Sequence, residues 1–446
     1  QLMLSGRNVF LTGKAGTGKS TVLHRFREQA GRNVVFLAPT GLAALNIGGM
    51  TIHRFLGLPP VDFFPAGYVP SPGEEQRRLI GTAECVVVDE ISMVRSDLFQ
   101  VLCDTLASLP LPGHEGRPLG GRQLVVSGDF FQLSPVVPDD GTEDRLLGDH
   151  FGAYAFHSLA WTRTLFHTAW LDQPHRQGAD QAFVTALDVL RRGRGSDELA
   201  DCLGWINRHA TVCAPPREAT VLCAYRRDAA AINRVRDAEL DSPLFRHDAQ
   251  VTGDFPSGDW PADFALEFRI GSRVMLLANC EGWNGPVYAN GDTGTVVGWD
   301  ARQSAARVVL DSGAEVAVEP HPWLNNEYTV TTDEHGRPAI ETTTVGTFTQ
   351  LPLRLAYAIT IHKAQGMGLE RAHLNLGRGA FACGQTYTAL SRVRSLAGLS
   401  LDRQLLPCDI IAAPAVLDFH DCLVNEAEFD GFLSAWADWS HPLAVF

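Results

Sequence analysis

The chain has 446 residues, of which 45% are hydrophobic and 20% charged; this is the composition of a globular protein with room for two or more domains of roughly 100 to 200 residues. No apolar run reaches the roughly 18 residues that cross a bilayer and no signal-peptide pattern opens the sequence, so we expect a cytoplasmic protein with no membrane partner. The net charge of −14 argues against a protein that coats duplex nucleic acid through a basic surface, but a single strand held in a narrow groove needs only a local field and stays open.

The first strong motif is a glycine-rich loop between a strand and a helix. Residues 9–21 read VFLTGKAGTGKST, in which a short apolar run leads into the glycines and Lys19-Ser20 opens a helix. The pattern fits G-x-x-x-x-G-K-[ST], whose backbone N–H groups surround nucleotide phosphates while the lysine contacts the β/γ oxygens and the hydroxyl binds Mg²⁺. An accidental glycine-rich turn is the alternative, which the flanking strand and helix disfavour. We predict a nucleoside triphosphate site made by Gly13, Ala15, Gly16, Thr17, Gly18, Lys19, Ser20 and Thr21.

A buried strand and a helix follow this loop. The β-branched and aromatic content of residues 33–38 predicts the strand. In residues 39–55, PTGLAALNIGGMTIHRF, Thr40 is placed to cap a helix that Gly48-Gly49 end. Residues 58–73 are rich in proline, glycine and aromatic residues, which indicates an excursion from the main fold.

Adjacent carboxylates end the next apolar run. Residues 85–93 read CVVVDEISM, and a strand inside a parallel sheet would bring Asp89 and Glu90 to its carboxyl edge, beside the glycine-rich loop. Asp89 is then placed to hold Mg²⁺ through water and Glu90 to polarise the attacking water. A bare strand end is the alternative, and the phosphate loop about seventy residues upstream favours the catalytic interpretation.

A third strand, residues 123–127, runs into GDFFQLSPV. Gln132 in this segment is a candidate sensor of the γ-phosphate because its amide both donates and accepts hydrogen bonds. On its own this signal is weak.

The order of these motifs resembles a known family. GKAGTGKS, APTGLAALNI with TIHRF, VVVDEISMV and PLGGRQLVVSGDFFQLSPV resemble the first RecA-like domain of a superfamily 1B DNA helicase. The stretch from Ser92 to Val136 is most similar to the PIF family (petite integration frequency helicases), with RecD-type helicases as close relatives.

The resemblance implies an α/β fold with two RecA-like P-loop NTPase domains, each with a parallel sheet, and a small SH3-like all-β insertion. We expect the first domain, 1A, at residues 1–165 with a 1B insertion at about 57–78. The second domain, 2A, is expected at residues 166–266 and 350–446, and the insertion, 2B, at 267–349.

The second domain should carry arginines that act on the nucleotide. In residues 171–177, LDQPHRQ, the resemblance places Arg176 opposite the γ-phosphate, and in residues 387–393, YTALSRV, it makes Arg392 an arginine finger. Such a finger stabilises charge that appears only in the transition state. A surface salt bridge is the alternative for any single arginine. Residues 219–225 predict a strand of this domain and 227–240 an amphipathic helix.

The insertion shows the alternation of β-strands. Residues 268–299 alternate apolar and polar side chains around Asn290-Gly291, which predicts a type I′ hairpin. Two more β-rich runs follow at 306–318 and 328–344, so we predict a small all-β barrel.

A motif after the insertion points to nucleic acid. Residues 353–368, LRLAYAITIHKAQGMG, predict a buried strand that ends at Thr360 and a helix that opens around His362 and Lys363. A histidine packed in the core is the alternative. Relatives usually carry threonine where this chain has Gly368. The residues expected to contact single-stranded DNA are Thr40, His53 and Phe55 in the first domain and Thr360, His362 and Lys363 in the second.

The resemblance implies an ATP-dependent DNA helicase that moves 5′-to-3′ on single-stranded DNA and unwinds duplex or structured DNA, in a family tied to DNA repair, recombination and telomere maintenance. It implies ATP and Mg²⁺ as cofactors, single-stranded and forked DNA as partners, a monomer, and association with the nucleoid in a bacterium. The alternatives are a translocase that does not unwind, a DNA-binding scaffold whose ATPase has decayed, and a P-loop phosphotransferase indifferent to DNA.

Overall fold

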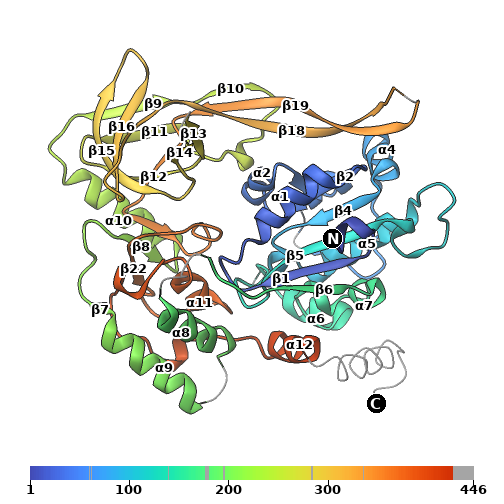
Figure 1. Cartoon of the computed structure of the whole chain (residues 1–446), viewed down its shortest axis with the longest axis horizontal. Helices are drawn as coiled ribbons and strands as arrows, with labels where there is room; N and C mark the ends of the chain where they lie inside the picture. The colour runs from blue at the N-terminus through green and yellow to red at the C-terminus, as the bar shows by residue number, and fades with distance from the viewer. Residues whose placement is uncertain are drawn as a thin grey trace. The chain divides into compact units, whose positions relative to one another are not determined.

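The computed structural model describes residues 1–59, 61, 63–138, 140–175, 180–193, 196–282, 285–334 and 336–424. The chain divides into two compact units (Figure 1). Unit 1 comprises Gln1–Gln173, Asn326–Thr344 and the segment from Ala413 on, and unit 2 comprises Pro174–Asn325 and Val345–Ala412. None of the helices in the described ranges combines the length and the hydrophobicity that crossing a membrane requires.

Unit 1 is built on a six-stranded sheet with the strand order β3-β2-β4-β5-β1-β6. Every strand pair in this sheet is parallel, so the predicted α/β architecture is confirmed for this unit. The strands are β1 (Val9–Gly13), β2 (Val34–Ala38), β3 (Met50–Thr51), β4 (Cys85–Val88), β5 (Gln123–Gly128) and β6 (His167–Leu171).

Helices cover this sheet on both faces because successive side chains of a strand point to opposite sides. On β1, Val9 and Leu11 pack with Leu23 and Phe26 of α1, whereas the ring of Phe10 faces other aromatic rings on the opposite side. The helices of unit 1 are α1 (Lys19–Gln29), α2 (Gly41–Ile47), α3 (Ile52–Leu56), α4 (Glu74–Thr82), α5 (Ser96–Ser108), α6 (Thr142–His150), α7 (Leu159–Thr164) and α12 (Pro414–Val424).

Two elements of unit 1 lie beyond the boundary predicted at residue 165. Strand β6 pairs in parallel with β1, and Phe419 of α12 stacks on Phe156 with ring centroids 4.3 Å apart. The sequence assigned both segments to the second domain. The unit to which each segment belongs is set by strand pairing and aromatic packing with residues far away in the sequence. Local periodicity does not indicate such long-range contacts. Residues 425–446 lie outside the described part of the chain.

Unit 2 contains a second parallel sheet, with the order β21-β8-β22-β23-β7. The strand and the helix predicted near 219–225 and 227–240 are confirmed as β8 and α10. The strands are β7 (Thr211–Val212), β8 (Thr220–Cys223), β21 (Ala358–Thr360), β22 (Ala372–Asn375) and β23 (Leu399–Leu401), and the helices are α8 (Gln181–Arg192), α9 (Ser196–His209), α10 (Arg226–Ala238) and α11 (Gln385–Leu390).

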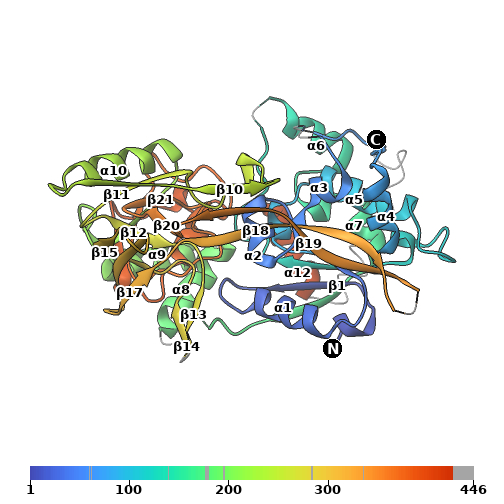
Figure 2. The same cartoon turned by 90° about the horizontal axis from the view of Figure 1, so that it is seen from above.

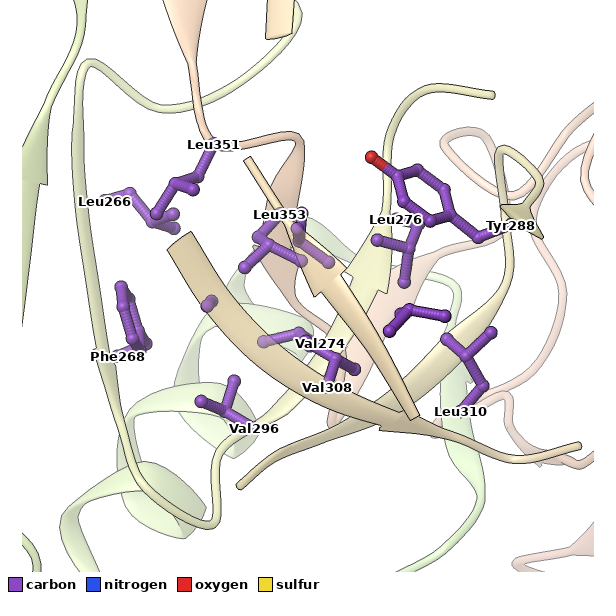
Figure 3. Packing of buried hydrophobic residues seen from close by; sticks show 13 residues of the cluster. Leu266, Phe268, Val274, Leu276, Tyr288, Val296, Val308, Leu310, Leu351 and Leu353 are labelled. Carbon is purple, nitrogen blue, oxygen red and sulfur yellow. The ribbon is translucent and has the colours of Figure 1, made fainter. Parts of the chain in front are cut away.

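A separate β-rich region of unit 2 has its own hydrophobic core (Figure 3). Its antiparallel sheet has the order β17-β16-β15-β12-β20, and Phe268, Val274 and Val296 are among the side chains with no exposed surface. The likeness of this region to an SH3 fold stays a prediction. Its strands are β9 (Leu244–Asp248), β11 (Ala265–Arg269), β12 (Arg273–Leu276), β13 (Cys280–Gly282), β14 (Gly285–Tyr288), β15 (Thr293–Asp300), β16 (Ala305–Leu310), β17 (Glu315–Val318) and β20 (Leu353–Leu355).

Two local predictions for this region are wrong. No hairpin forms at Asn290-Gly291, since β14 pairs with β13 and β15 with β12 and β16; Gly291 has a φ of +95° but Asn290 has no positive φ, and a type I′ turn needs both. The strand predicted over 353–360 is split into β20, which joins the antiparallel sheet, and β21, which joins the parallel one.

A long β-arm contributes its residues Asn326–Thr344 to unit 1. Strands β18 (His321–Thr332) and β19 (Pro338–Gln350) form a three-stranded sheet with β10 (Gln250–Gly253) (Figure 2). Because β3 pairs only with Leu37 and Ala38, the first half of β2 has an open edge, which the arm covers.

Phe36, Asn33 and Arg54 bond to residues of the arm. The N–H of Phe36 donates to the hydroxyl of Tyr328 at 3.2 Å. The side chain of Asn33 donates to the carbonyl oxygen of Pro338 at 3.1 Å and accepts from the amide of Ile340 at 2.9 Å, and Arg54 pairs with Glu327. Covering an open strand edge in this way also protects it from pairing with other chains.

Candidate functional site

The predicted nucleotide-binding segments meet at one edge of the sheet of unit 1. Strand β5 lies between β4 and β1, so the carboxyl ends of these three parallel strands are neighbours. The glycine-rich loop follows β1, the carboxylates follow β4, and the glutamine segment follows β5. In the register of the sheet, Ser127 lies opposite Leu11, and Val88 opposite Val126. This edge is where open α/β sheets bind their ligands.

The loop after β1 has the backbone that a phosphate site needs. Gly16 and Gly18 have φ values of +75° and +87°, a region that L side chains rarely adopt. Gly13 is required for a different reason, since a Cβ there would lie 2.3 Å from the carbonyl oxygen of Leu171. The hydroxyl of Thr17 donates to the carbonyl oxygen of Lys14 at 2.9 Å, which ties the loop to itself.

Lys19 begins helix α1 and turns back over the loop. Its ammonium group donates to the carbonyl oxygens of Gly13 at 2.8 Å and Lys14 at 2.9 Å. Ser20 and Thr21 follow in the exposed first turn of the helix, where a hydroxyl is accessible to a metal ion. Ala15 and the side chain of Thr17 are buried, so these two predicted residues would contact a phosphate chiefly through their backbone N–H groups.

The Asp89 carboxyl follows β4, and 9% of the residue is exposed. Burial raises the pKa of this carboxyl, while the Glu90 amide, the Ser127 hydroxyl and the positive charge of Lys19 act to lower it. Lys19 therefore lies within electrostatic range of Asp89, as the prediction of a shared site requires.

Oxygen ligands are those that Mg²⁺ prefers, and it commonly keeps waters and substrate phosphates as further ligands. A carboxylate and a serine hydroxyl fit that chemistry. No cluster of three or more His, Cys, Asp or Glu side chains able to hold a metal occurs in the described ranges.

Glu90 adopts a left-handed backbone, with a φ of +52°. A non-glycine residue in this region costs of order 1 kcal/mol or more and is common at functional sites. The turn is tight, because a Cβ on Gly128 of β5 would lie 2.9 Å from a methyl carbon of Ile91. The strained turn fixes the direction in which the half-buried Glu90 side chain leaves the sheet edge.

Gln132 lies in the segment after β5 and is 6% exposed. Its N–H donates to the carbonyl oxygen of Asp129 at 2.9 Å, and the Asp129 carboxylate accepts from the amide of Phe131 at 3.3 Å. Asp129 and Ser127 were not predicted as part of the site. A polar residue at the end of a strand next to the phosphate loop is the signal that identifies them.

In unit 1 the predicted DNA-binding residues differ in accessibility. Thr40 is exposed and caps α2, as predicted, by accepting from the amide of Ala43 at 3.3 Å. His53 is half-buried, and its burial and the charge of Arg95 lower its pKa. Phe55 has no exposed surface, so its ring is not accessible in this structure, and its place among the DNA-binding residues stays a prediction. The apolar side of α3 faces the core, and this ring belongs to it.

In unit 2 the segment after β21 consists of turns and not the predicted helix. The amide of Ala364 donates to the carbonyl oxygen of Thr360, the amide of Gln365 donates to that of His362 at 3.3 Å, and Gly366 has a φ of +81°, which ends the helical path. The Thr360 hydroxyl accepts from the amide of Lys363 at 3.3 Å. Lys363 is exposed and His362 half-buried.

Of the two predicted arginines, the structure describes only Arg392. Arg176 lies outside the described residues. Arg392 follows α11 and is 1% exposed, and its guanidinium donates to the carbonyl oxygen of Thr388 at 2.9 Å and to the hydroxyl of Ser391 at 2.8 Å. Its role as an arginine finger stays a prediction.

The chain is similar to known proteins in both sequence and fold. A family model described as PIF1-like helicase matches residues 2–197. The ATP-dependent DNA helicase PIF1 of Homo sapiens is 35% identical over 439 residues, which cover 94% of this chain and 62% of the human protein. The chain thus spans less than two thirds of the length of that relative.

Two solved structures cover nearly the whole chain. Pif1 of Bacteroides sp in complex with ADP-AlF4 is 32% identical with a TM-score of 0.84, and the match covers 95% of both chains. Bacteroides Pif1 bound to ssDNA is also 32% identical, with a TM-score of 0.65 and coverage of 95% of both chains.

Proposed function

This chain belongs to the PIF1-like helicase family, and on that premise we propose that it is an ATP-dependent DNA helicase that moves 5′-to-3′ on single-stranded DNA and unwinds duplex or structured DNA. The observation that supports the proposal is the topology of unit 1, in which the loop after β1, the carboxylates after β4 and the segment after β5 follow neighbouring parallel strands, with Lys19 in electrostatic range of Asp89. The polarity rests on the family resemblance.

For hydrolysis, each residue at the sheet edge has a proposed role. Backbone N–H groups of the loop and the Lys19 ammonium bind the phosphates, and Glu90 orients and polarises the attacking water. Gln132 responds to the γ-phosphate. Ser20 and, through water, Asp89 would hold Mg²⁺, which supplies positive charge against the developing negative charge of the phosphates.

Arg176 and Arg392 are proposed to supply further positive charge to the transition state, an effect worth about 10³ to 10⁵ in turnover for an arginine finger. Because Arg392 is buried in unit 2, its replacement should also reduce stability. The variant Arg392→Lys keeps the charge and is therefore a better test than Arg392→Ala. Its turnover should fall sharply, and its melting temperature should change less than that of Arg392→Ala.

For DNA, the proposed contacts are Thr40 and His53 in unit 1 and Thr360, His362 and Lys363 in unit 2. Cycles of ATP binding and hydrolysis would change which contacts hold the strand, and directional movement follows. Opening a base pair costs only about 1.4 kcal/mol on average, so one ATP per step is ample. We propose a monomer that acts on single-stranded and forked DNA in the cytoplasm, at the nucleoid in a bacterium.

The direct test is steady-state phosphate release from ATP with and without a single-stranded oligonucleotide. The proposal predicts turnover that depends strongly on DNA. Turnover that is equal with and without DNA would favour a P-loop phosphotransferase and contradict the proposal. Absence of turnover with retained DNA binding would identify a scaffold whose ATPase has decayed.

A further inference from the structure

Three aromatic rings form a row on the surface of unit 2. The ring of Phe381 lies 5.0 Å from that of Tyr225 with an interplanar angle of 27°, and 6.4 Å from that of His362 with an angle of 21°. Tyr225 lies between β8 and α10, His362 in the turns after β21, and Phe381 in the loop before α11. Near-parallel rings at these separations are in the stacking range.

Phe381 is unusually accessible for its type. It is 52% exposed, whereas most phenylalanines of the described chain are buried. An isolated exposed apolar residue needs no explanation, but this ring continues a stack of aromatic rings. Its exposed surface is therefore open to another flat aromatic group.

The loop that carries Phe381 is held in place. The amide of Phe381 donates to the side-chain oxygen of Gln385 at 3.0 Å, and Gln385 is 1% exposed. Glycines with positive φ, Gly379 and Gly384, flank the ring. Because a buried anchor fixes the backbone, presenting the ring costs little ordering entropy when a ligand binds.

Cations surround the aromatic row. Arg226 and Arg227 are exposed at the start of α10, and the Arg227 guanidinium lies 5.7 Å from the centre of the Tyr225 ring. Burial is the main cause that lowers the pKa of His362, and the charge of Arg226 adds to it; Arg354 is the main cause that lowers the pKa of Lys363, and Arg226 contributes there too. Two opposing charges lie at this place: Asp263 acts on Lys363 and Arg354, and Asp228 pairs with Arg227 at 3.3 Å.

We propose that Phe381, with Tyr225 and His362, is a stacking platform for the bases of the single strand, and that Arg226, Arg227 and Lys363 bind the phosphates beside it. The proposal rests on the proposed function, whose DNA contacts in this unit did not include Phe381, Tyr225 or the two arginines. Stacked rings next to a few cations are what sequence-independent binding of single strands requires, because every base has a flat face. The platform also explains how a chain of net charge −14 binds a polyanion, since the attraction is local and partly not electrostatic.

The test measures the binding of the whole chain to two DNA strands of about 15 nucleotides by fluorescence anisotropy. Each strand carries a 5′ fluorescein; one consists of thymidines and the other of abasic sites. The two strands carry the same phosphates and differ in bases. Wild type should bind the thymidine strand more tightly. Phe381→Leu should weaken binding of the thymidine strand by about 5- to 150-fold, the range for one stacked base, and leave the abasic strand unchanged. Phe381→Trp should restore the preference.

Three controls separate the possible failures. Phe151→Leu removes a ring that is 37% exposed in unit 1 and should leave both affinities unchanged. Arg226→Gln removes one phosphate contact, so the slope of log affinity against log salt concentration should become less negative by roughly 0.7. Phe381→Leu should leave this slope unchanged. Turnover of ATP without DNA should be the same in wild type and Phe381→Leu.

Equal affinity of wild type for the two strands, or an unchanged affinity of Phe381→Leu for thymidines, would overturn the platform and leave the helicase proposal intact. If wild type binds neither strand and its ATPase ignores DNA, both proposals fail.

Discussion

The ammonium group of Lys19 donates a hydrogen bond of 2.8 Å to the carbonyl oxygen of Gly13, so the first residue of α1 is bonded to the last residue of β1. The glycine-rich loop between them is thereby closed on itself. A phosphate that enters the loop gains the same ammonium group as a partner, and the N–H groups at the start of α1 already point toward it.

The first prediction concerns this lysine. Lys19→Ala should lower ATP turnover by about 10² to 10³, the usual effect of losing one donor to transition-state charge. Phosphate release under saturating DNA measures it. Lys14→Ala is the matched control because it removes the same charge from the same loop, and its turnover should stay near wild type. Wild-type turnover in Lys19→Ala would refute the role of this residue.

The second prediction concerns Asp89. Burial raises the pKa of this carboxyl, so the folded state favours its protonated form. Above the unfolded pKa of about 3.9 the native state binds more protons than the unfolded state, and stability falls as pH rises. Asp89→Asn should therefore melt at a higher temperature than wild type at pH 7.5 without nucleotide, with the gap narrowing toward pH 4, while ATP turnover is lost.

Asp97→Asn is the control for that experiment. Asp97 is fully buried and accepts two hydrogen bonds from Arg95, at 3.0 and 2.9 Å. Breaking a buried pair leaves an uncompensated charge, so this variant should melt at a lower temperature. If Asp89→Asn also melts below wild type at pH 7.5, the inference that burial of the Asp89 charge destabilises the native state is wrong.

The third prediction is a loss of stability in acid. Burial lowers the pKa of His157 to about 4, and its Nδ1 accepts from the amide of Tyr154 at 3.2 Å. Between the unfolded pKa of about 6.5 and pH 4 only the unfolded state takes up the proton, so stability falls as pH is lowered through this window.

Denaturant unfolding at pH 7.5 and pH 4.5 measures this effect. His157→Gln should lose less unfolding free energy over that range than wild type, by at most about 3 kcal/mol. His209→Gln, which changes an exposed histidine, should behave as wild type. An identical loss in His157→Gln and wild type would refute the assignment.

The fourth prediction concerns the β-arm. Tyr328→Phe leaves the N–H of Phe36 without its acceptor, and an unpaired buried donor costs about 1 to 3 kcal/mol. Chemical denaturation measures the difference. Thr343→Val, on the exposed part of the same arm, should change stability by less than about 0.5 kcal/mol. A neutral Tyr328→Phe would mean that the arm does not stabilise β2.

Local patterns in the sequence were sufficient for the nucleotide site. The strand β1, the glycines at 16 and 18 and the opening of α1 are set by neighbouring residues, and β4 and β5 each end in polar residues that a parallel sheet must bring to one edge. This is why sequence patterns alone predict that Lys19 and Asp89 share one site.

Which side chains are buried and where a helix ends depend on tertiary packing, and local sequence patterns do not predict them. The resemblance includes Phe55 among the DNA-binding residues, but which side of the short helix α3 is buried depends on residues far away in the sequence, and Phe55 lies on the buried side. The helix expected at His362 gives way to turns before Gly366. Phe381 could not be predicted as a site residue, because an aromatic residue in a glycine-rich loop has no periodicity that indicates exposure.

The most direct test of the helicase account is ATP-dependent strand displacement from two duplexes that differ only in carrying a 5′ or a 3′ single-stranded tail. The account predicts that wild type releases the strand from the 5′-tailed duplex when ATP and Mg²⁺ are present, that the 3′-tailed duplex stays intact, and that Lys19→Ala releases neither. Displacement from the 3′-tailed duplex alone, or displacement that does not require ATP, would contradict it.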